Sequence, residues 1–442
     1  MSLLMDKRLD GIRKYLLECY GLDINEAKCH FSTQNYAFIF PGKPNMIRVS
    51  IGRKKSREET LSEVLWVDDL KQFSETVCEP FPSLKDHLIE EFEIDGVHYR
   101  AAMFRTAKGN VRDIAKLDPM YFIAVGDFLG RIHAASADAA NQGITYRRKK
   151  WDEKREATME GAKDILPPEL MARINDVYSQ VKKVPEDPRW FGMIHGDFHI
   201  NNFFVDGNNI WAFDFDECCY GYFMYDIASA CITWLMYGYL AEQGKSRQQV
   251  LYEDILPYFK FGYELHLKLP EEHWKLLELF LEDRCCVMAL ALSQLQQSGI
   301  LKDLEAARQF VYFPLTQKNV LDGFDLMLKQ NGAIATGFET SGSENEGASC
   351  PSAHEASGRT VLTLGSRLDA ATAPLLDKQI MQLLDNDCDN LLLDCSNLLY
   401  ISSAGIRILL KAFKRFKRFK LEHVGPEAEE ILSMTGLMDL LR

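Results

Sequence analysis

The sequence predicts an α+β fold of two unequal lobes followed by a small α/β domain, and three observations lead to this prediction. Residues 30–105 alternate short apolar runs with turns, residues 117–330 follow mostly helical patterns, and residues 359–442 alternate strand-like with helical segments. The chain of 442 residues is also longer than one ordinary domain, which commonly holds about 100–200 residues. We therefore expect a small lobe built on an antiparallel sheet, a larger helical lobe and a separate C-terminal domain.

The small lobe carries two local signals. Asp95-Gly96 lies between the runs HLIEEFEI and VHYRAAMF, and this dipeptide favours the two-residue turn of a β-hairpin. Leu61, Leu65 and Leu70 fall at helical spacing between the strand pairs, which predicts one helix beside the sheet.

A change in composition near residue 335 divides the chain. Residues 336–358 are rich in Gly, Ser and Glu and contain almost no large apolar side chains. Such a segment cannot bury enough surface to offset the entropy lost on ordering. We predict a flexible linker there, preceded by a first lobe at 1–105 and a helical lobe with the catalytic loop at 106–335, and followed by the small domain at 359–442.

Composition and charge restrict the partners. The formal net charge of −13 argues against nucleic acid or an anionic membrane and favours a cationic small substrate, with the ordinary solubility of a cytosolic protein as the alternative explanation. The longest apolar run, residues 227–241, is shorter than the ~20 residues of a membrane span. The basic segment KAFKRFKRFK has Phe at every third position, which is typical of a buried stripe with a solvated face. Eleven cysteines without CxxC spacing fit a reducing compartment, so a cytoplasmic protein is expected.

The segment HGDFHINN, from His195 to Asn202, holds the clearest chemical signal. Asp197 precedes Asn202 by five positions, and Asp214 follows after a turn at 206–209 that brings the two segments together. Carboxylate and amide oxygens suit a hard cation such as Mg²⁺ and not zinc. Phosphoryl transfer needs such a cation and a carboxylate that orients the attacking hydroxyl. These residues therefore predict a phosphotransferase that uses ATP and Mg²⁺.

HGDFHINN and the later AFDFDECCYGYFMYDIA together resemble the signature of the aminoglycoside phosphotransferase and choline kinase superfamily. The resemblance implies a bilobal, protein-kinase-like α+β fold. It implies that Asp197 is the catalytic base and that Asn202 and Asp214 hold the metal. It also implies that His195 braces the catalytic loop and that Asp226 supports the helical lobe behind it.

The nucleotide side of the site is expected in the first lobe. Arg48, in the strand MIRVSI, stands where well-known members of this superfamily carry a phosphate-contacting lysine, and Glu63 is placed to pair with it. Arginine keeps its charge and forks onto phosphate, although an exposed arginine and a surface glutamate are the alternative. The loop FSTQNYAF lacks a glycine-rich pattern, so Ser32 and Asn35 are expected to cover the phosphates. The segment MFRTAKG is expected to connect the lobes and to bind the adenine through its backbone groups.

The C-terminal segments GSRLDAATAP and LLLDCSNLLYISSAGIRILL resemble the STAS domain of anti-sigma-factor antagonists over residues 359–442. The resemblance implies a regulatory module with a protein partner. It places Ser403 at the phosphoacceptor position, at a helix start where free N–H groups favour a phosphate. Ser402 stands where many members have aspartate, and simple helix capping by the two serines is the alternative.

Three functions are compatible with these residues. The first is a kinase for a hydroxyl group of a small molecule, with a regulatory STAS domain. The second is a serine protein kinase in a partner-switching circuit of the anti-sigma-factor antagonist type, acting on its own Ser403. The third, a non-enzymatic scaffold with a kinase fold, is disfavoured because Asp197, Asn202 and Asp214 fill all three catalytic positions.

Overall fold

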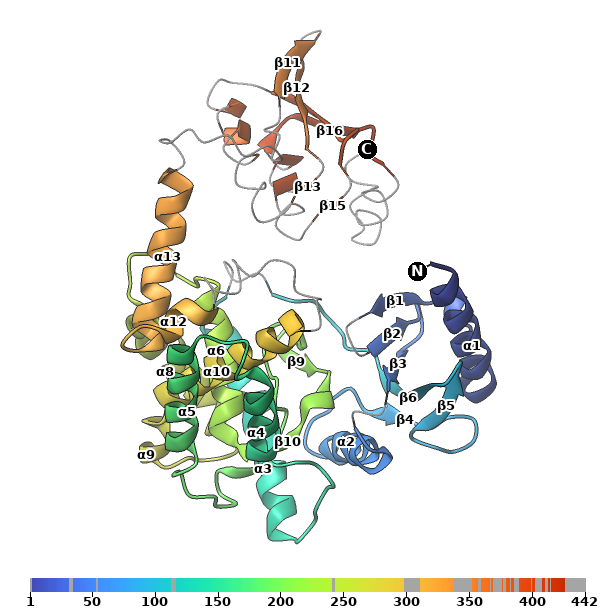
Figure 1. The fold of residues 1–442 in the computed structure, drawn as a ribbon, viewed down its shortest axis with the longest axis vertical. Helices are drawn as coiled ribbons and strands as arrows, with labels where there is room; N and C mark the ends of the chain where they lie inside the picture. The colour runs from blue at the N-terminus through green and yellow to red at the C-terminus, as the bar shows by residue number, and fades with distance from the viewer. Residues whose placement is uncertain are drawn as a thin grey trace. The chain divides into compact units, whose positions relative to one another are not determined.

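The computed structural model divides into two compact units, residues 1–330 and 331–442, which Figure 1 colours along the chain. It describes residues 2–31, 35–52, 55–112, 117–240, 243–297 and 311–337, and in the C-terminal part 352–356, 359–365, 389–398 and 415–425 with shorter stretches between them. Each unit is described by itself below.

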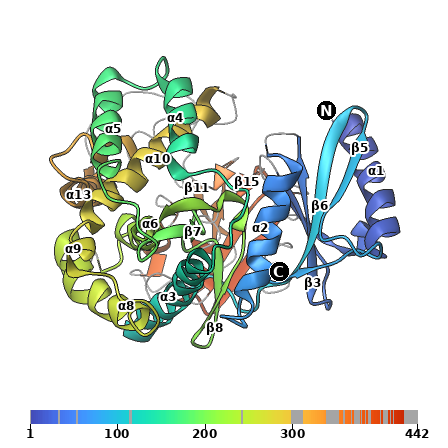
Figure 2. The same cartoon turned by 90° about the horizontal axis from the view of Figure 1, so that it is seen from below.

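The first unit begins with an antiparallel sheet of six strands in the order β1-β2-β3-β6-β4, with β5 paired to β6. The strands are β1 (Lys28–Phe31), β2 (Asn35–Ile39), β3 (Asn45–Ile51), β4 (Pro80–Phe81), β5 (Glu90–Ile94) and β6 (Val97–Arg105). Helix α1 (Ser2–Tyr20) shares a core with the sheet, in which Ile12 and Leu16 pack with Phe38 and Tyr99. Both views show α1 on the side of the sheet away from the helical lobe (Figures 1 and 2).

The hairpin and the helix expected in the small lobe are both present. Strands β5 and β6 pair across Asp95 and Gly96, whose φ angles of 50° and 74° suit a two-residue hairpin turn. Helix α2 (Arg57–Leu70) begins with a capping box between Ser56 and Glu59, in which each side chain bonds the other residue's backbone N–H. Both predictions are confirmed.

The helical lobe is built around two closely packed helices, α3 and α8. A Cβ atom on Gly126 of α3 would lie 2.1 Å from the carbonyl oxygen of Phe259, and one on Gly262 of α8 would lie 2.1 Å from that of Ile123. Only glycine permits so close an approach of the two backbones. The described helices are α3 (Pro119–Asn141), α4 (Trp151–Ala162), α5 (Pro168–Val181), α6 (Phe223–Met236), α7 (Arg247–Gln249), α8 (Leu256–Tyr263), α9 (Glu271–Trp274), α10 (Leu277–Gln297), α12 (Phe313–Leu315) and α13 (Val320–Gly337), with a π-helical turn at Val250–Ile255.

Two short antiparallel pairs interrupt the helices. One joins β7 (Phe191–Ile194) to β10 (Cys219–Tyr222), and the other joins β8 (Phe203–Asp206) to β9 (Asn209–Ala212). A 3₁₀ turn, η3 (Phe215–Glu217), follows β9. Trp66 of α2 packs edge-on against Phe215, with ring centroids 5.5 Å apart. The two lobes therefore contact each other beside the segment that holds the candidate metal ligand.

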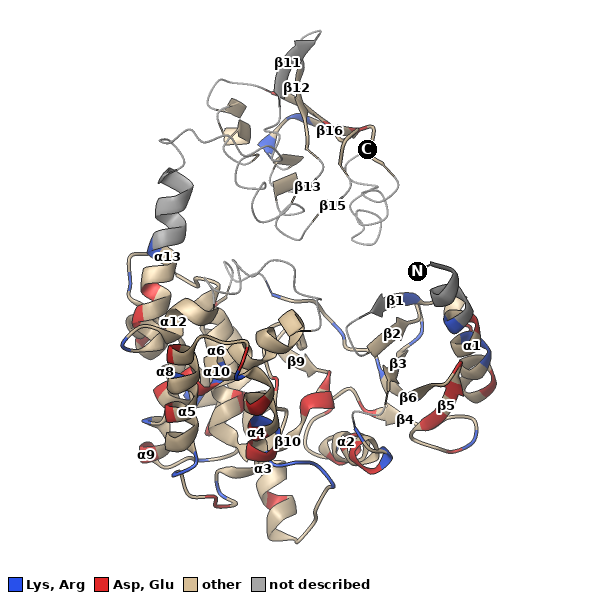
Figure 3. Ribbon diagram, viewed as in Figure 1, with Lys and Arg blue, Asp and Glu red and all other residues tan. Residues whose placement is uncertain are grey.

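The charged residues do not separate by sign over the first unit. Figure 3 shows basic and acidic residues on both of its lobes. None of the described helices combines the length and the apolar character that crossing a bilayer requires.

The C-terminal unit has a sheet in the order β11-β12-β14-β16. Strands β12 (Arg359–Thr363), β14 (Asn390–Asp394) and β16 (Arg418–Glu422) are parallel, whereas β11 (Ser352–Ala356) is antiparallel to β12. A second pair joins β13 (Arg367–Leu368) to β15 (Tyr400–Ile401) in parallel. The parallel strands confirm the expected α/β character. Strand β11 lies inside the predicted linker 336–358, so that expectation is wrong for residues 352–356. The linker was predicted because its side chains can bury little apolar surface. Residues 352–356 are ordered instead by backbone pairing with β12.

Candidate active site

The catalytic-loop sequence starts where the buried strand β7 ends. His195 has no exposed surface, and its Nε2 lies 3.0 Å from the carbonyl oxygen of Phe213. Gly196 follows with φ at 80°, and a Cβ there would lie 2.4 Å from the carbonyl oxygen of Glu217. His195 and Gly196 thus lie against residues 213–217, the segment that holds Asp214, and the bracing role of His195 stays a prediction.

Asp226, at the start of α6, holds the same loop from behind. Its carboxylate accepts the backbone N–H groups of His195 at 2.7 Å and of Gly196 at 2.9 Å. His133 of α3 lies 3.3 Å from the same carboxylate and 2.9 Å from the hydroxyl of Tyr263. Burial lowers the pKa of His133, and this effect outweighs the opposing one of Asp226. His133 is therefore a neutral, hydrogen-bonded core side chain.

Asp197 is the candidate base, and its carboxylate has three polar neighbours. The amide nitrogen of Asn202 donates to its backbone oxygen at 2.9 Å and to Oδ2 at 3.2 Å, and His199 Nε2 lies 3.3 Å from Oδ2. The guanidinium of Arg284 contacts Oδ1. Burial raises the pKa of Asp197, but the attraction of Arg284 and the contacts with His199 outweigh burial, so the pKa lies below its usual range. Asp197 is therefore ionised, and its Oδ1 is occupied by Arg284.

Asp214 occupies a left-handed backbone conformation (φ 64°, ψ 55°) between β9 and η3. The preceding Phe213 donates its N–H to the carbonyl oxygen of Asn202 at 3.0 Å, so the two segments expected to converge are joined directly. Loss of hydration and the neighbouring Asp216 raise the pKa of Asp214 to about 7, against the lowering effect of Arg48. Arg48 Nη1 lies 4.0 Å from the Asp214 carboxylate.

Arg48 and Glu63 form the ion pair that the sequence suggested. Arg48 Nη2 lies 2.7 Å from Glu63 Oε1, and both side chains are buried. The guanidinium also lies over the ring of Phe104, 5.3 Å from its centroid. Burial lowers the pKa of Arg48, but Glu63 and Asp216 outweigh this effect and raise it above its ordinary value. Arg48 is therefore a fixed positive charge, and the exposed alternative is excluded.

A cavity of about 380 Å³ opens beside this pair. Its wall includes Asn35, Arg48, Glu63 and Asp214, and residues 104–107 of the expected connection also line it. The remaining wall is formed by Asn201 and by the apolar residues Ala37, Ile39, Met46, Val67, Cys78, Phe204, Phe213 and Phe215. The Asn35 amide donates to Asp216 Oδ2 at 3.2 Å. Ser32 lies outside the described residues.

A second cavity, of about 290 Å³, lies on the Asp197 side of the loop. Aromatic side chains form part of its wall: Trp151, Tyr222, Tyr225 and Phe280. Its charged wall consists of Lys154, Arg155, Asp197, Glu217, Asp283 and Arg284. The loop that carries Asp197 and Asn202 therefore separates an apolar cavity from a charged one.

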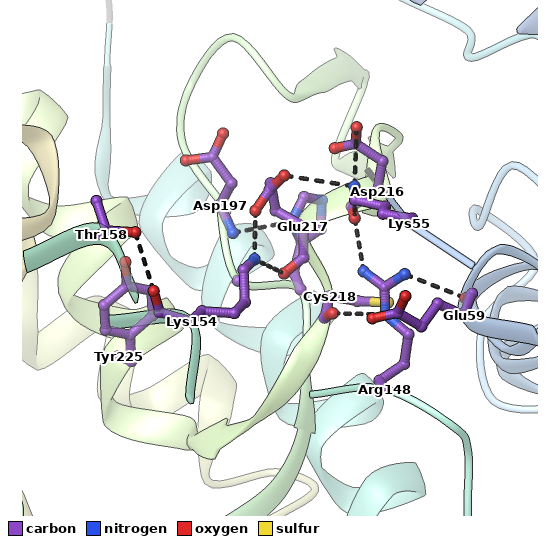
Figure 4. Close-up of polar contacts among 12 residues, drawn as sticks. Lys55, Glu59, Arg148, Lys154, Thr158, Asp197, Asp216, Glu217, Cys218 and Tyr225 are labelled. Atoms are coloured by element: carbon purple, nitrogen blue, oxygen red, sulfur yellow. Dashed lines mark hydrogen bonds and ion pairs between the residues drawn. The ribbon is translucent and has the colours of Figure 1, made fainter. Parts of the chain in front are cut away.

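Several cations around η3 were not identified from the sequence. Arg148 donates to the backbone oxygens of Asp216 at 2.6 Å and of Cys218 at 2.8 Å. Lys55 lies 3.3 Å from the Asp216 carboxylate, and Lys154 contacts that of Glu217. Figure 4 shows these side chains converging on η3 from both lobes. In the sequence each of them lies among other charged or polar residues, which does not reveal a distant partner.

Comparison with known proteins agrees with this geometry. Residues 32–254 match the model of the phosphotransferase enzyme family, and residues 351–442 match that of the STAS domain. Amicoumacin kinase of Bacillus subtilis (strain 168) is 21% identical over 247 residues, which cover 55% of this chain and 73% of that protein.

Two solved structures share the fold. The amicoumacin kinase hAmiN, in complex with AMP-PNP, Ca²⁺ and Ami, has a TM-score of 0.58 at 19% identity and covers 73% of this chain and 93% of its own. A microcompartment-associated aminopropanol kinase has a TM-score of 0.53 at 19% identity, with 73% and 98% covered. The expected kinase-like bilobal fold is confirmed. The chain therefore belongs to the phosphotransferase enzyme family, as an enzyme that acts on hydroxyl groups, and it carries a STAS domain at its C-terminal end.

Proposed function

We propose that the protein transfers the γ-phosphoryl group of ATP to a hydroxyl group of a small molecule, with Mg²⁺ as the divalent cation and the STAS domain as a regulatory module. The observation that carries this proposal is the position of the loop from Asp197 to Asn202. It presents an ionised carboxylate to one cavity, and the segment bonded to it presents Asp214 to the other. Two reactants could thus approach one loop from opposite sides, as in-line transfer requires.

The cavity beside Arg48 fits a nucleotide. Its apolar wall suits an adenine ring, and residues 104–107 bring backbone N–H and C=O groups to it. Arg48 is held by Glu63 with its second Nη facing Asp214 at 4.0 Å, where its charge would meet the phosphates. Asn35 would border the phosphates from the sheet, and Ser32 stays a prediction.

The donor set fits a magnesium ion. The Asp214 carboxylate accepts no hydrogen bond from the described part of the chain, and its raised pKa shows that Arg48 alone does not compensate its charge. The amide nitrogen of Asn202 donates hydrogen bonds to Asp197, which leaves its amide oxygen able to bind a metal ion. Among the described residues no group of three His, Cys, Asp or Glu side chains could hold a metal. This agrees with Mg²⁺, which binds one or two protein oxygens together with substrate phosphates and would neutralise charge on those phosphates.

The chain itself supplies the group that accepts the proton of the acceptor hydroxyl. The oxygen of the acceptor hydroxyl forms a bond to the γ-phosphorus while the bond from that phosphorus to the β–γ bridging oxygen breaks, which leaves ADP. The hydroxyl proton passes to the carboxylate of Asp197. Asn202 orients this carboxylate, and the loop is fixed by His195 and Asp226. Positioning of this kind supplies much of the catalysis in phosphoryl transfer.

A small-molecule acceptor is favoured over the alternatives. The relatives with the same fold are kinases of amicoumacin and of aminopropanol by name. Ser403 lies outside the described residues, so its phosphorylation, by this chain or by another, stays a prediction. The scaffold alternative conflicts with a carboxylate, an amide and an Arg–Glu pair that are all in place.

The test is transfer of labelled phosphate from Mg·ATP to a panel of small hydroxylated molecules. We expect Asp197→Asn to lower kcat by about 100- to 10,000-fold, the range of a lost general base. Asp187→Asn is the matched control, because Asp187 is a surface carboxylate paired with Arg189 and should keep full activity. Unchanged turnover in Asp197→Asn would contradict the assignment of the base.

A further inference from the structure

The cavity beside Asp197 is lined by charges that are already paired. Glu217 and Asp283 are the acidic residues of this wall, besides Asp197, that a cationic acceptor would need. In the structure Asp283 is 1% exposed and binds Arg155 through two contacts, at 2.5 and 3.0 Å. Glu217 contacts Lys154 and lies 3.4 Å from Lys55, and Figure 4 shows the two lysines on either side of it. Neither carboxylate is available to neutralise a cationic acceptor.

Arg284 is the one cation of this wall whose partner is the candidate base. Its side chain is 10% exposed, its Nη2 contacts Asp197 Oδ1, and its Nη1 donates to the Tyr225 hydroxyl at 3.0 Å. Its Nε is buried and bonds to none of the described residues. Burial of a guanidinium with an unused N–H is costly unless a ligand completes its hydrogen bonds. Arg284 therefore has hydrogen-bonding capacity that Asp197 and Tyr225 do not use.

The contact between Arg284 and Asp197 also conflicts with catalysis. Arg284 occupies Oδ1 of Asp197, while Asn202 and His199 lie at Oδ2, so neither oxygen is open to an acceptor hydroxyl. If Asp197 turns to the acceptor hydroxyl, Arg284 is left buried without a counter-ion, which is strongly unfavourable. The other cations of the wall, Lys154 and Arg155, are balanced by Glu217 and Asp283. One positive charge of the cavity therefore has to be met by the acceptor.

We propose that the acceptor carries a carboxylate beside its hydroxyl group and that Arg284 receives this carboxylate in place of Asp197. This inference rests on the proposed function, since it concerns the acceptor of the same phosphoryl transfer. Arginine binds carboxylates in a planar fork, and Arg284 already holds the carboxylate of Asp197. Asp197 is thus released from Arg284 only when the bound acceptor carries a carboxylate. Arg284 is a specificity residue, and its acceptors are hydroxy acids or hydroxy amino acids.

The first experiment compares acceptors that differ only in the carboxylate. Serine is compared with ethanolamine, and homoserine with 3-aminopropanol, at saturating Mg·ATP. We expect the carboxylate member of at least one pair to have a kcat/KM about 10- to 100-fold higher, the range that a charge-assisted hydrogen bond supplies. Arg284→Gln should remove this preference by raising KM for the carboxylate member, and Arg284→Lys, which keeps the charge without the fork, should restore part of it.

Arg173→Gln is the matched control. Arg173, like Arg284, pairs with a carboxylate; its partner is Glu282 on α10. Arg173 is absent from the described walls of both cavities. This variant should keep the preference. An equal or higher kcat/KM for ethanolamine and 3-aminopropanol would overturn the inference and leave the proposed function intact. A preference for glycerol 3-phosphate over every carboxylate acceptor would overturn it as well.

A binding measurement tests the inference without phosphoryl transfer, because the compounds used need no hydroxyl group. 2-Aminobutyrate carries the carboxylate of homoserine without its hydroxyl, and propylamine lacks both groups. Calorimetric titration of the full chain with Mg·ADP present should show tighter binding of 2-aminobutyrate than of propylamine, and Arg284→Gln should abolish the difference. Equal affinities, or no binding of 2-aminobutyrate to protein that binds Mg·ADP, would overturn the inference. Failure to bind Mg·ADP at all would instead contradict the proposed function.

Discussion

The carboxylate of Asp226 accepts the backbone N–H of His195 at 2.7 Å, and both residues are fully buried. This bond ties the first turn of α6 to the start of the catalytic loop. Because the same carboxylate also receives the N–H of Gly196 and lies beside His133, one side chain sets the direction in which the loop leaves β7. The position of Asp197 thus depends on a residue that lines neither described cavity wall.

The Asp226→Asn variant tests this dependence. An amide has one oxygen for the two N–H groups, so one buried donor loses its partner, which costs about 1–3 kcal/mol. We expect the free energy of unfolding in urea to fall by that amount and kcat to fall at least tenfold. The dissociation constant of Mg·ATP should stay within twofold, because the nucleotide contacts lie on other segments. An equal loss of nucleotide affinity would show that Asp226 acts on the whole fold and not on the loop.

Arg48 gives a second prediction. Replacing it by Gln removes the charge proposed to meet the phosphates, so we expect the dissociation constant of Mg·ATP, measured by calorimetry, to rise about 10- to 100-fold. Arg48→Lys should lose less, because the charge remains while the fork is lost. Arg13→Gln is the control, since Arg13 of α1 pairs with Asp23 and lines neither described cavity wall. Unaltered affinity in Arg48→Gln would place the phosphates elsewhere.

Removal of the metal gives a third prediction. Chelation by EDTA should abolish phosphate transfer, and added Mg²⁺ should restore it. Asp214→Asn should raise the Mg²⁺ concentration for half-maximal activity at least tenfold, because a carboxylate is lost from the donor set. Asp206→Asn is the matched control, as Asp206 is an exposed carboxylate at the end of β8 in the same hairpin. A Mg²⁺ requirement that is the same in both variants would rule out Asp214 as a ligand.

The sequence predicts best the features that are encoded locally. The turn at Asp95-Gly96 and the HGDFHINN loop depend on neighbouring residues, and both are found where they were expected. Leu65 lies at helical spacing in α2 but is 40% exposed, whereas Glu63 on the same helix is 1% exposed. The buried face of α2 borders the site and therefore carries polar groups, so the spacing of its leucines does not identify that face.

The acceptor side of the site could not be predicted in this way. The contact between Arg284 and Asp197 joins residues 87 positions apart, and no motif marks the arginine. Asp283 is an acidic residue in the sequence, but the fold places it against Arg155. Pairing of buried charges across separate helices depends on how those helices pack. A single sequence shows the charges but not their partners.

Packing of α3 against α8 supports the last prediction. Gly126→Ala adds a Cβ that would lie 2.1 Å from the Phe259 carbonyl oxygen, so the helices must separate. Overpacking of this kind costs about 1–3 kcal/mol, and we expect the free energy of unfolding to fall by that amount. Gly161→Ala is the matched control, because its Cβ meets nothing within 4 Å and alanine in a helix is favoured over glycine by about 0.5–1 kcal/mol. Because α8 carries Tyr263, which bonds His133 beside Asp226, Gly126→Ala should also lower kcat while Gly161→Ala should not. Equal stability of the two variants would mean that α3 and α8 lie farther apart than described.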